Sequence, residues 1–173
     1  MECTLVKLEN FSGTHSSIYS VYIEEEEKTL FDKFIEENIS EYNLEIKDIV
    51  QRLLTIGKKT GAREQFFKTN EGVPGDGVCA LYDDPNSKLR LYCIRYGNDI
   101  VILGGGGFKP KTIRALQEDK KLEAENYFLR DLSKEITQRL KDKDITKPNF
   151  MDFEGDLTFN FEDYEITKIQ KNK

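Results

Sequence analysis

The chain of 173 residues has no tryptophan, a single histidine and only three cysteines. Because His15 carries the one imidazole, the sequence argues against a histidine-rich metal centre. Cys3, Cys79 and Cys93 are an odd set without CxxC spacing, so neither a disulfide framework nor a zinc site is indicated. We therefore expect no metal ion and no cofactor.

The sequence also lacks any apolar run that approaches the roughly 20 residues needed to cross a bilayer. Its first residues, MECTLVKLENF, carry charge where a signal peptide would have its apolar segment. We therefore expect a cytoplasmic protein with no membrane partner. With 34% charged and 38% hydrophobic residues, the chain suits one globular domain with a short appendage.

The net charge of −6 hides an uneven distribution along the chain. Residues 51–120 hold 12 Lys and Arg against 8 Asp and Glu, whereas the flanks are strongly acidic, notably in the EEEE run at 24–27. A basic middle between acidic ends is compatible with a polyanionic partner such as nucleic acid. Ordinary surface charge explains the same pattern equally well.

The spacing of hydrophobic residues predicts an α+β fold, with an antiparallel meander sheet packed by two N-terminal helices. We expect a domain over residues 1–145, followed by a C-terminal extension over 146–173 that contains one strand and a disordered end. The predicted elements, in chain order, are a hairpin from 4–11 and 16–24, a helix capped by Thr29, a helix over 44–57 that stops at Gly57, meander strands at 77–83, 88–96 and 99–104, a helix from Thr112 that Pro148 ends, and a strand in 157–161.

The alternation of residues 88–96 assigns their side chains to two faces of the sheet. The odd positions are the more apolar, and we expect them to pack on the two helices. The even positions include Arg90 and Tyr92 and are predicted to border water or a cleft. A turn over DPNS would place Tyr82 opposite Arg90, and Ala80 opposite Tyr92, so that one guanidinium and two phenols share an exposed face.

Such a group has two explanations. The forked guanidinium group of Arg90 can donate hydrogen bonds to a phosphate, and tyrosine rings stack on nucleic-acid bases. Alternatively, Arg and Tyr form an ordinary cross-strand pair, which stabilises a sheet by about 0.2–1 kcal/mol.

Four consecutive glycines, 104–107, follow the third meander strand and precede FKPK. No frame of this segment supplies a P-loop, and an antiparallel meander is the wrong setting for a dinucleotide fingerprint. The pattern predicts a loop that lets the backbone approach a partner closely and brings Lys109 and Lys111 to a helix start, where an anion is favoured. A tight turn at a strand end is the simpler alternative.

The segment EQFFKTNEGVPGDGVCALYDDPNSKLRLYCIRYGNDIVILGGGGFKPK resembles the core of RelE/ParE-superfamily toxins, especially the HigB-like branch. The resemblance covers roughly residues 44–140. It implies a toxin of a type II toxin–antitoxin system that acts as a metal-free, ribosome-dependent mRNA endonuclease. It also implies a cognate antitoxin, expected to be a helix-turn-helix protein, and mRNA on the ribosome as partners.

The resemblance further implies a set of site residues in this chain. A ribose 2′-oxygen would attack the neighbouring phosphate with the help of a base, while cations stabilise the developing charge. Arg90 and Lys109 would hold the phosphate, and Tyr92 or Tyr82 would orient the base or assist proton transfer. The expected RNA-binding residues are Lys58, Lys59, Lys68, Arg95, Lys111 and Arg114.

Two other functions remain open on the sequence. One is a ParE-like inhibitor that poisons a DNA topoisomerase without cutting RNA. The other is a non-catalytic relative that keeps the scaffold and binds a protein partner, for example through its acidic ends.

Overall fold

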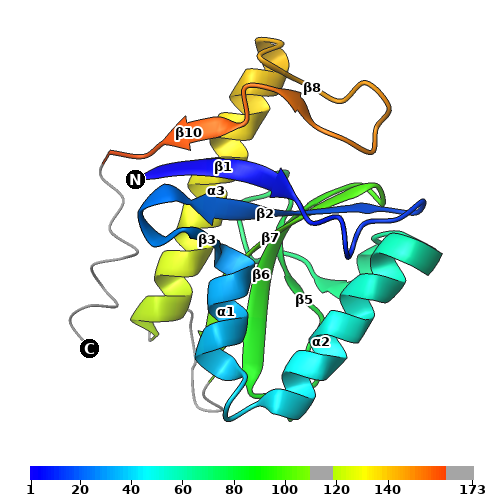
Figure 1. Ribbon diagram of the computed structural model, residues 1–173, viewed down its shortest axis with the longest axis vertical. Helices are drawn as coiled ribbons and strands as arrows, with labels where there is room; N and C mark the ends of the chain where they lie inside the picture. Colours follow the sequence, from blue (N-terminus) through cyan, green and yellow to red (C-terminus); the bar gives the residue numbers. More distant parts are fainter. Residues whose placement is uncertain (110–118, 163–173) are drawn as a thin grey trace.

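A computed structural model describes residues 1–109 and 119–162 (Figure 1). Its main feature is an eight-stranded sheet in the order β10-β1-β2-β7-β6-β5-β4, with β3 paired to β2. Neighbouring strands are antiparallel except β2 and β7, which are parallel. The strands are β1 (Glu2–Lys7), β2 (Ser17–Ile23), β3 (Lys28–Thr29), β4 (Phe67–Lys68), β5 (Val78–Leu81), β6 (Leu89–Tyr96), β7 (Ile100–Phe108) and β10 (Thr158–Asn160).

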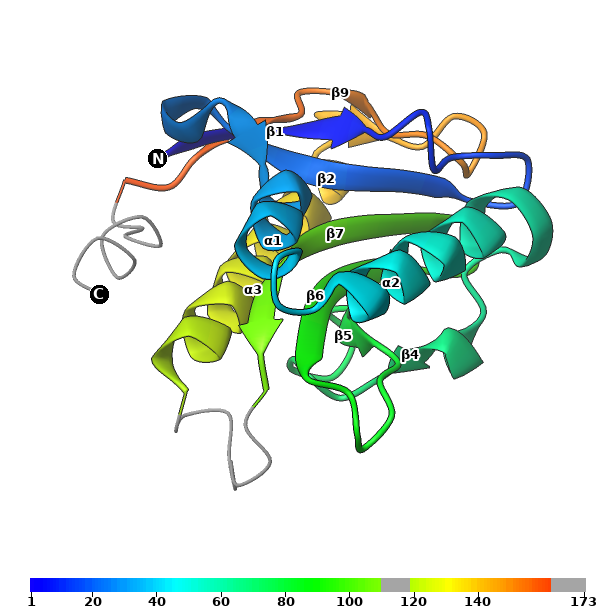
Figure 2. The same cartoon turned by 60° about the horizontal axis from the view of Figure 1, so that its bottom comes forward.

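Helices cover both faces of this sheet. Helices α1 (Leu30–Asn38) and α2 (Asn43–Thr55) lie on one face, and α3 (Lys120–Lys141) lies on the other (Figure 2). Short helical turns η1 (Glu24–Glu26), η2 (Ile56–Thr60) and η3 (Glu64–Phe66), and a small ribbon of β8 (Ile145–Thr146) and β9 (Glu154–Gly155), complete the described chain. Within those residues, no helix combines the length and apolar character that crossing a membrane requires. The mixed α and β architecture with a mostly antiparallel sheet confirms the predicted α+β class.

The meander follows the predicted pairing. Cys79 lies opposite Cys93 and Ala80 lies opposite Tyr92, as alternation around the DPNS turn requires. The apolar strand β7 is central, between β2 and β6, as its two apolar faces indicated. The N-terminal hairpin and the Thr29 cap are also confirmed, because the Thr29 side chain accepts a hydrogen bond from the Asp32 amide in a capping box.

The two faces of β6 are both buried, which corrects one expectation. Leu91 and Cys93 join the core under α1 and α2, as predicted. Tyr92 and Ile94, however, belong to a second core formed with α3, and each is fully buried. The even face therefore does not border water along this stretch, because the C-terminal helix returns to cover it.

The four glycines lie within β7 and are buried, so the predicted glycine loop is wrong. Their lack of side chains lets other parts of the chain approach the strand closely. A Cβ on Gly104 would lie 2.6 Å from a methyl carbon of Leu129, and one on Gly105 would overlap the Glu125 carboxylate, both on α3. A Cβ on Gly106 would overlap the backbone carbonyl of Arg90. The glycines therefore serve packing within the molecule.

The end of the second helix also differs from the prediction. Helix α2 ends at Thr55, and the chain continues through the π turn η2 to Gly61, whose φ of +80° ends the helical path. Gly57 is instead held against the backbone of Phe11, where any Cβ would overlap the Phe11 carbonyl oxygen. Gly57 therefore allows two backbone segments to approach closely, and the prediction that it ends the helix is wrong.

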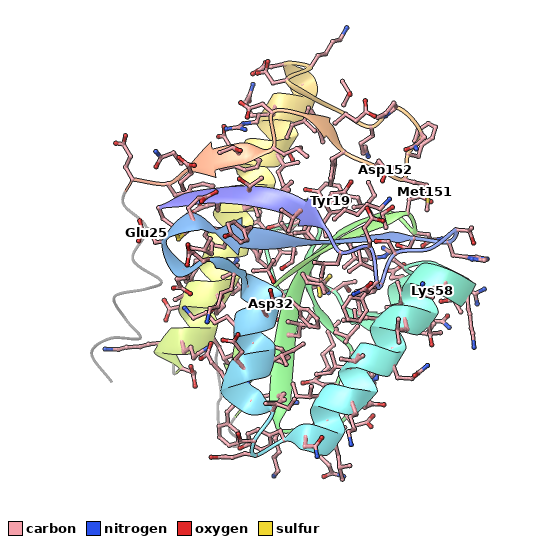
Figure 3. The ribbon with its side chains drawn as sticks, viewed as in Figure 1. Tyr19, Glu25, Asp32, Lys58, Met151 and Asp152 are labelled. Atoms are coloured by element: carbon pink, nitrogen blue, oxygen red, sulfur yellow. The ribbon has the colours of Figure 1, made fainter. Side chains whose placement is uncertain are left out.

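The C-terminal segment up to residue 162 adds one strand to the main sheet. The predicted strand is present as β10, which pairs with β1. Tyr19 and Asp152 lie near each other (Figure 3), where the Tyr19 hydroxyl accepts from the Phe153 amide and Asp152 pairs with Lys7 at 2.8 Å. The expected disordered end and the expected helix start at Thr112 lie outside the described residues.

Candidate functional site

Three cationic side chains converge on one carboxylate at the end of the meander. The Lys109 ammonium lies 2.5 Å from Asp83 Oδ2, Lys68 pairs with Asp83 Oδ1, and Arg90 Nε lies 3.8 Å from Oδ2. We call these four residues the Asp83 cluster. It brings together Arg90 and Lys109, which the resemblance implied would hold a phosphate, and Lys68, which it implied would bind RNA.

The sheet itself assembles this cluster. Lys68 is on β4, opposite Ala80 of β5, and Asp83 is the second residue after β5. The amide of Lys109, just past β7, donates to the carbonyl of Lys88 at the start of β6. The end of β7 and the β5–β6 turn thus lie at the same end of the sheet (Figure 2). Residues far apart in sequence therefore meet because β5 and β7 end, and β6 begins, at the same end of the sheet.

The electrostatics of the cluster leave an excess of positive charge. Asp83 is only 5% exposed, and burial by itself raises the pKa of its carboxyl. The bonded ammonium groups of Lys109 and Lys68 outweigh burial and hold the pKa below its ordinary value of 3.8. Asp83 is thus ionised at neutral pH, and three positive charges against one negative leave a surplus that favours an anion.

Tyr82 is the aromatic side chain that the cluster presents to solvent. It is 46% exposed, and the Lys68 ammonium lies 5.8 Å from the centre of its ring. Its carbonyl accepts a hydrogen bond from Arg52 of α2, which fixes the backbone at this point. A ligand bound to Lys68 would therefore lie next to the Tyr82 ring.

Tyr92 does not reach the surface. It is fully buried, and burial raises the pKa of its hydroxyl to about 12, opposed in part by the nearby Arg90 guanidinium. Tyr92 thus lies beside Arg90 inside the molecule, and of the two predicted tyrosines only Tyr82 can meet a ligand.

Arg95 lies away from the cluster. It is five residues beyond Arg90 on β6, which corresponds to about 16 Å along a strand. It donates to the Ala62 carbonyl at 2.7 Å and to Asn98 at 2.8 Å. These bonds hold the connection between η2 and the sheet, so Arg95 has a structural role.

Lys58 and Lys59 are not members of the Asp83 cluster. They belong to η2, beyond the C-terminal end of α2, and Figure 3 shows Lys58 at that end, near the β1–β2 loop. Helix α2 runs alongside the cluster: Glu45 in its first turn accepts a hydrogen bond from the Lys88 amide at 2.6 Å, and Arg52 in its last turn donates to the Tyr82 carbonyl. The last two predicted cations, Lys111 and Arg114, lie outside the described residues.

Asp83 is the member of the site that sequence reasoning missed. Its only signal was its position next to DPNS, where aspartate is common for reasons of turn formation alone. A buried partner for three cations depends on how the turn folds back on the sheet, which the pattern of residues does not specify.

Among the residues that the structure describes, no group of three or more His, Cys, Asp or Glu side chains is placed to hold a metal ion. The chain matches no protein-family model, no curated protein and no solved structure. The functional argument therefore depends on the geometry of the Asp83 cluster and its surroundings.

Proposed function

We propose that this chain is a RelE/ParE-like toxin of a type II toxin–antitoxin system that binds and cleaves mRNA on the ribosome. The observation that carries the proposal is the convergence of Lys68, Arg90 and Lys109 on one carboxylate. The order of elements, with two helices between the N-terminal hairpin and the meander, is compatible with that family. The partners would be the mRNA and a helix-turn-helix antitoxin that keeps the toxin inactive.

The internal ion pairs leave room for a phosphate. An ammonium carries three donors and a guanidinium five, so one carboxylate cannot occupy them all. Lys68 retains 31% of its side-chain exposure, and Lys109 retains 15%. Asp83 would hold three like charges together in the free protein, and a phosphate oxygen would bind to their unused donors.

The proposed chemistry is transfer of the phosphoryl group within the RNA. The 2′-hydroxyl loses its proton to a base, its oxygen bonds to phosphorus, and the bond to the 5′-oxygen breaks as that oxygen takes up a proton. The products are a 2′,3′-cyclic phosphate and a free 5′-hydroxyl. Arg90, Lys109 and Lys68 would stabilise the negative charge that builds on the phosphate oxygens.

One observation favours a second candidate, in which the cluster binds a phosphate backbone without cutting it. The proton acceptors beside the cations are Asp83 and Tyr82, and the lowered pKa of Asp83 makes it a weak base. A ParE-like topoisomerase inhibitor or a non-catalytic interaction protein would need only the cationic surface.

Inducible expression with growth measurement and mapping of transcript ends tests the proposal. We expect growth arrest and new transcript ends in translated mRNA. Arg90→Ala or Lys109→Ala should reduce cleavage by about 100-fold, the usual effect of losing one group that stabilises transition-state charge. Lys141→Ala is the matched control, because this exposed lysine lies in the last turn of α3, at the opposite end of that helix from Lys121, which contacts β7 near the cluster.

Three outcomes separate the candidates. Cleavage that depends on Arg90 and Lys109 but not Lys141 supports the toxin proposal. A DNA-damage response with intact transcripts favours the topoisomerase inhibitor. If the wild-type chain is harmless and RNA stays intact on translating ribosomes, the enzyme proposal is wrong.

A further inference from the structure

An apolar recess of about 260 Å³ opens beside the Asp83 cluster. Its floor is formed by Ile56, Phe66 and Tyr82, which come from η2, η3 and the end of β5. Ile56 is buried, while Phe66 is half-buried and Tyr82 is exposed. Two aromatic rings and an aliphatic side chain thus line a surface hollow of the size that suits a small planar group.

The recess and the Asp83 cluster share a wall. The amide of Tyr82 donates to the carbonyl of Phe66 at 2.8 Å, so the two aromatic residues are fixed next to each other. Two residues beyond Phe66, the Lys68 ammonium contacts both the Tyr82 ring and Asp83. A ligand whose anionic group lies at Lys68 therefore has the recess directly beside it.

The rim of the recess offers free polar groups. Gln51 of α2 and Gln65 of η3 line it, and both are exposed. Within residues 1–109 and 119–162, neither side-chain amide takes part in a hydrogen bond. Each amide carries donors and an acceptor, which are the groups that the edges of nucleic-acid bases also present.

We propose that this recess binds one base of the RNA strand whose phosphate lies at the Asp83 cluster. The base stacks on Tyr82 and Phe66, and its edge is read by Gln51 and Gln65. This inference rests on the proposed function, because the strand reaches the recess only if its phosphate is held by Lys68 and its neighbours. An apolar side chain of a protein partner would use the aromatic floor but would leave the two amides without partners, so the base is favoured.

Binding of the full chain to a fluorescent single-stranded oligoribonucleotide tests the inference. The comparison is with oligonucleotides of the same length and charge in which abasic sites replace the bases. Wild type should bind the intact strand more tightly than the abasic one. Tyr82→Ala should lower affinity for the intact strand about tenfold, within the range for loss of one base–aromatic stack, and should remove the preference for bases. Tyr82→Phe should keep that preference.

One control lies outside both sites, and the other lies in the Asp83 cluster but outside the recess. Phe150→Ala removes an aromatic ring that is 72% exposed in the segment between β8 and β9, and it should change neither affinity. Lys109→Ala should weaken binding of intact and abasic strands equally, since it acts on the phosphate. Thermal unfolding of each variant checks that the fold is retained.

The outcomes distinguish this inference from the proposed function. If wild type binds intact and abasic strands equally, and salt and Lys109→Ala weaken that binding, then the recess does not bind a base. The proposed function is not contradicted by that result. The absence of any salt-dependent RNA binding contradicts the proposed function and the recess with it. An unchanged preference for bases in Tyr82→Ala also contradicts base binding in the recess. Another ligand, such as an apolar side chain of a protein partner, would then occupy it.

Discussion

Asp83 shows how one residue can both hold a charged site together and limit what it binds. Without its carboxylate, Lys68, Arg90 and Lys109 would repel one another in a partly buried space. With it, the three cations stay together, but part of their hydrogen-bonding capacity is used inside the molecule. Removing the charge of Asp83 should therefore lower the stability of the fold and raise its affinity for anions.

Asp83→Asn tests this opposition. We expect the free energy of unfolding to fall by about 2 kcal/mol, since charge-assisted hydrogen bonds are lost. We expect affinity for a short oligoribonucleotide to rise, with a steeper dependence on salt because more positive charge faces the phosphates. Urea unfolding and binding titrations at several salt concentrations measure the two effects. Asp84→Asn, on the exposed next residue, should leave both unchanged, and a loss of RNA affinity in Asp83→Asn would contradict the argument.

Glu125 on α3 is a second buried carboxylate, and its pH behaviour is opposite to that of Asp83. Burial raises the pKa of its carboxyl from 4.5 to about 7, although Lys121 lies 3.8 Å away. Lys33, Glu37 and Glu26 act on it more weakly. Because the folded state keeps the proton that the unfolded chain releases near pH 4.5, stability should fall as pH rises from about 4.5 to about 7.

Glu125→Gln should remove this pH dependence. The shift corresponds to about 3 kcal/mol of stability at most, since each pKa unit is worth about 1.4 kcal/mol. Urea unfolding at a series of pH values should show that the free energy of unfolding of wild type falls with pH, whereas that of the variant does not. The variant should be the more stable protein above pH 7. Glu123→Gln, at a half-buried position on the same helix, is the control. Identical slopes for wild type and Glu125→Gln would refute the assignment.

At the level of secondary structure, β7 and α3 pack together because β7 lacks side chains where the helix crosses it. Gly104 and Gly105 face Leu129 and Glu125 of α3, while Gly106 faces the backbone of β6 at its bulge. Gly107 is different, because a Cβ there would meet only the flexible end of the Lys121 side chain, 3.4 Å away. The four glycines therefore tolerate substitution unequally.

Gly106→Ala should destabilise the fold by about 3 kcal/mol, the upper part of the range for overpacking, because a backbone carbonyl cannot move aside. Gly107→Ala should cost less than about 1 kcal/mol, since the Lys121 chain can rotate away. Urea unfolding of the two variants makes a matched comparison on adjacent residues. Equal losses would show that the strand needs glycine for a reason other than space.

The sequence predicted elements better than it predicted their partners. Alternation and the DPNS turn were enough for the meander and its register, and the Thr29 cap marked a helix start, because these are local signals. The same strand pattern could not reveal that α3 covers Tyr92, since that contact joins residues more than thirty positions apart. Arg90 and Lys109 were predicted as one site. The Asp83 carboxylate that joins them was not predicted, because its contacts also depend on long-range folding.

Over the whole molecule, the sheet extends well beyond the meander. The hairpin β1–β2 attaches to β7, and β10 then adds to β1, so the two ends of the described chain lie on neighbouring strands (Figure 1). Two hydrophobic cores result, one on each face of the sheet. Composition favoured one domain with an appendage, but it could not show that the segment after residue 146 closes one of these cores.

Phe159 on β10 tests whether that closure stabilises the whole domain. It is 1% exposed, stacks with Phe161, and lies under the Arg139 guanidinium, which is 4.0 Å from the centre of its ring. Phe159→Ala should lower the free energy of unfolding by about 3 kcal/mol, as large-to-small changes in a core do. Phe150→Ala, which removes the same side chain from an exposed position, should cost less than about 0.5 kcal/mol. If Phe159→Ala unfolds at the same urea concentration as wild type, or only its C-terminal segment loosens, then β10 is an appendage after all. A single cooperative transition at lower urea would instead make β10 part of the unit that holds β1, β2 and β7 in place, and with them the strand end that presents Lys109.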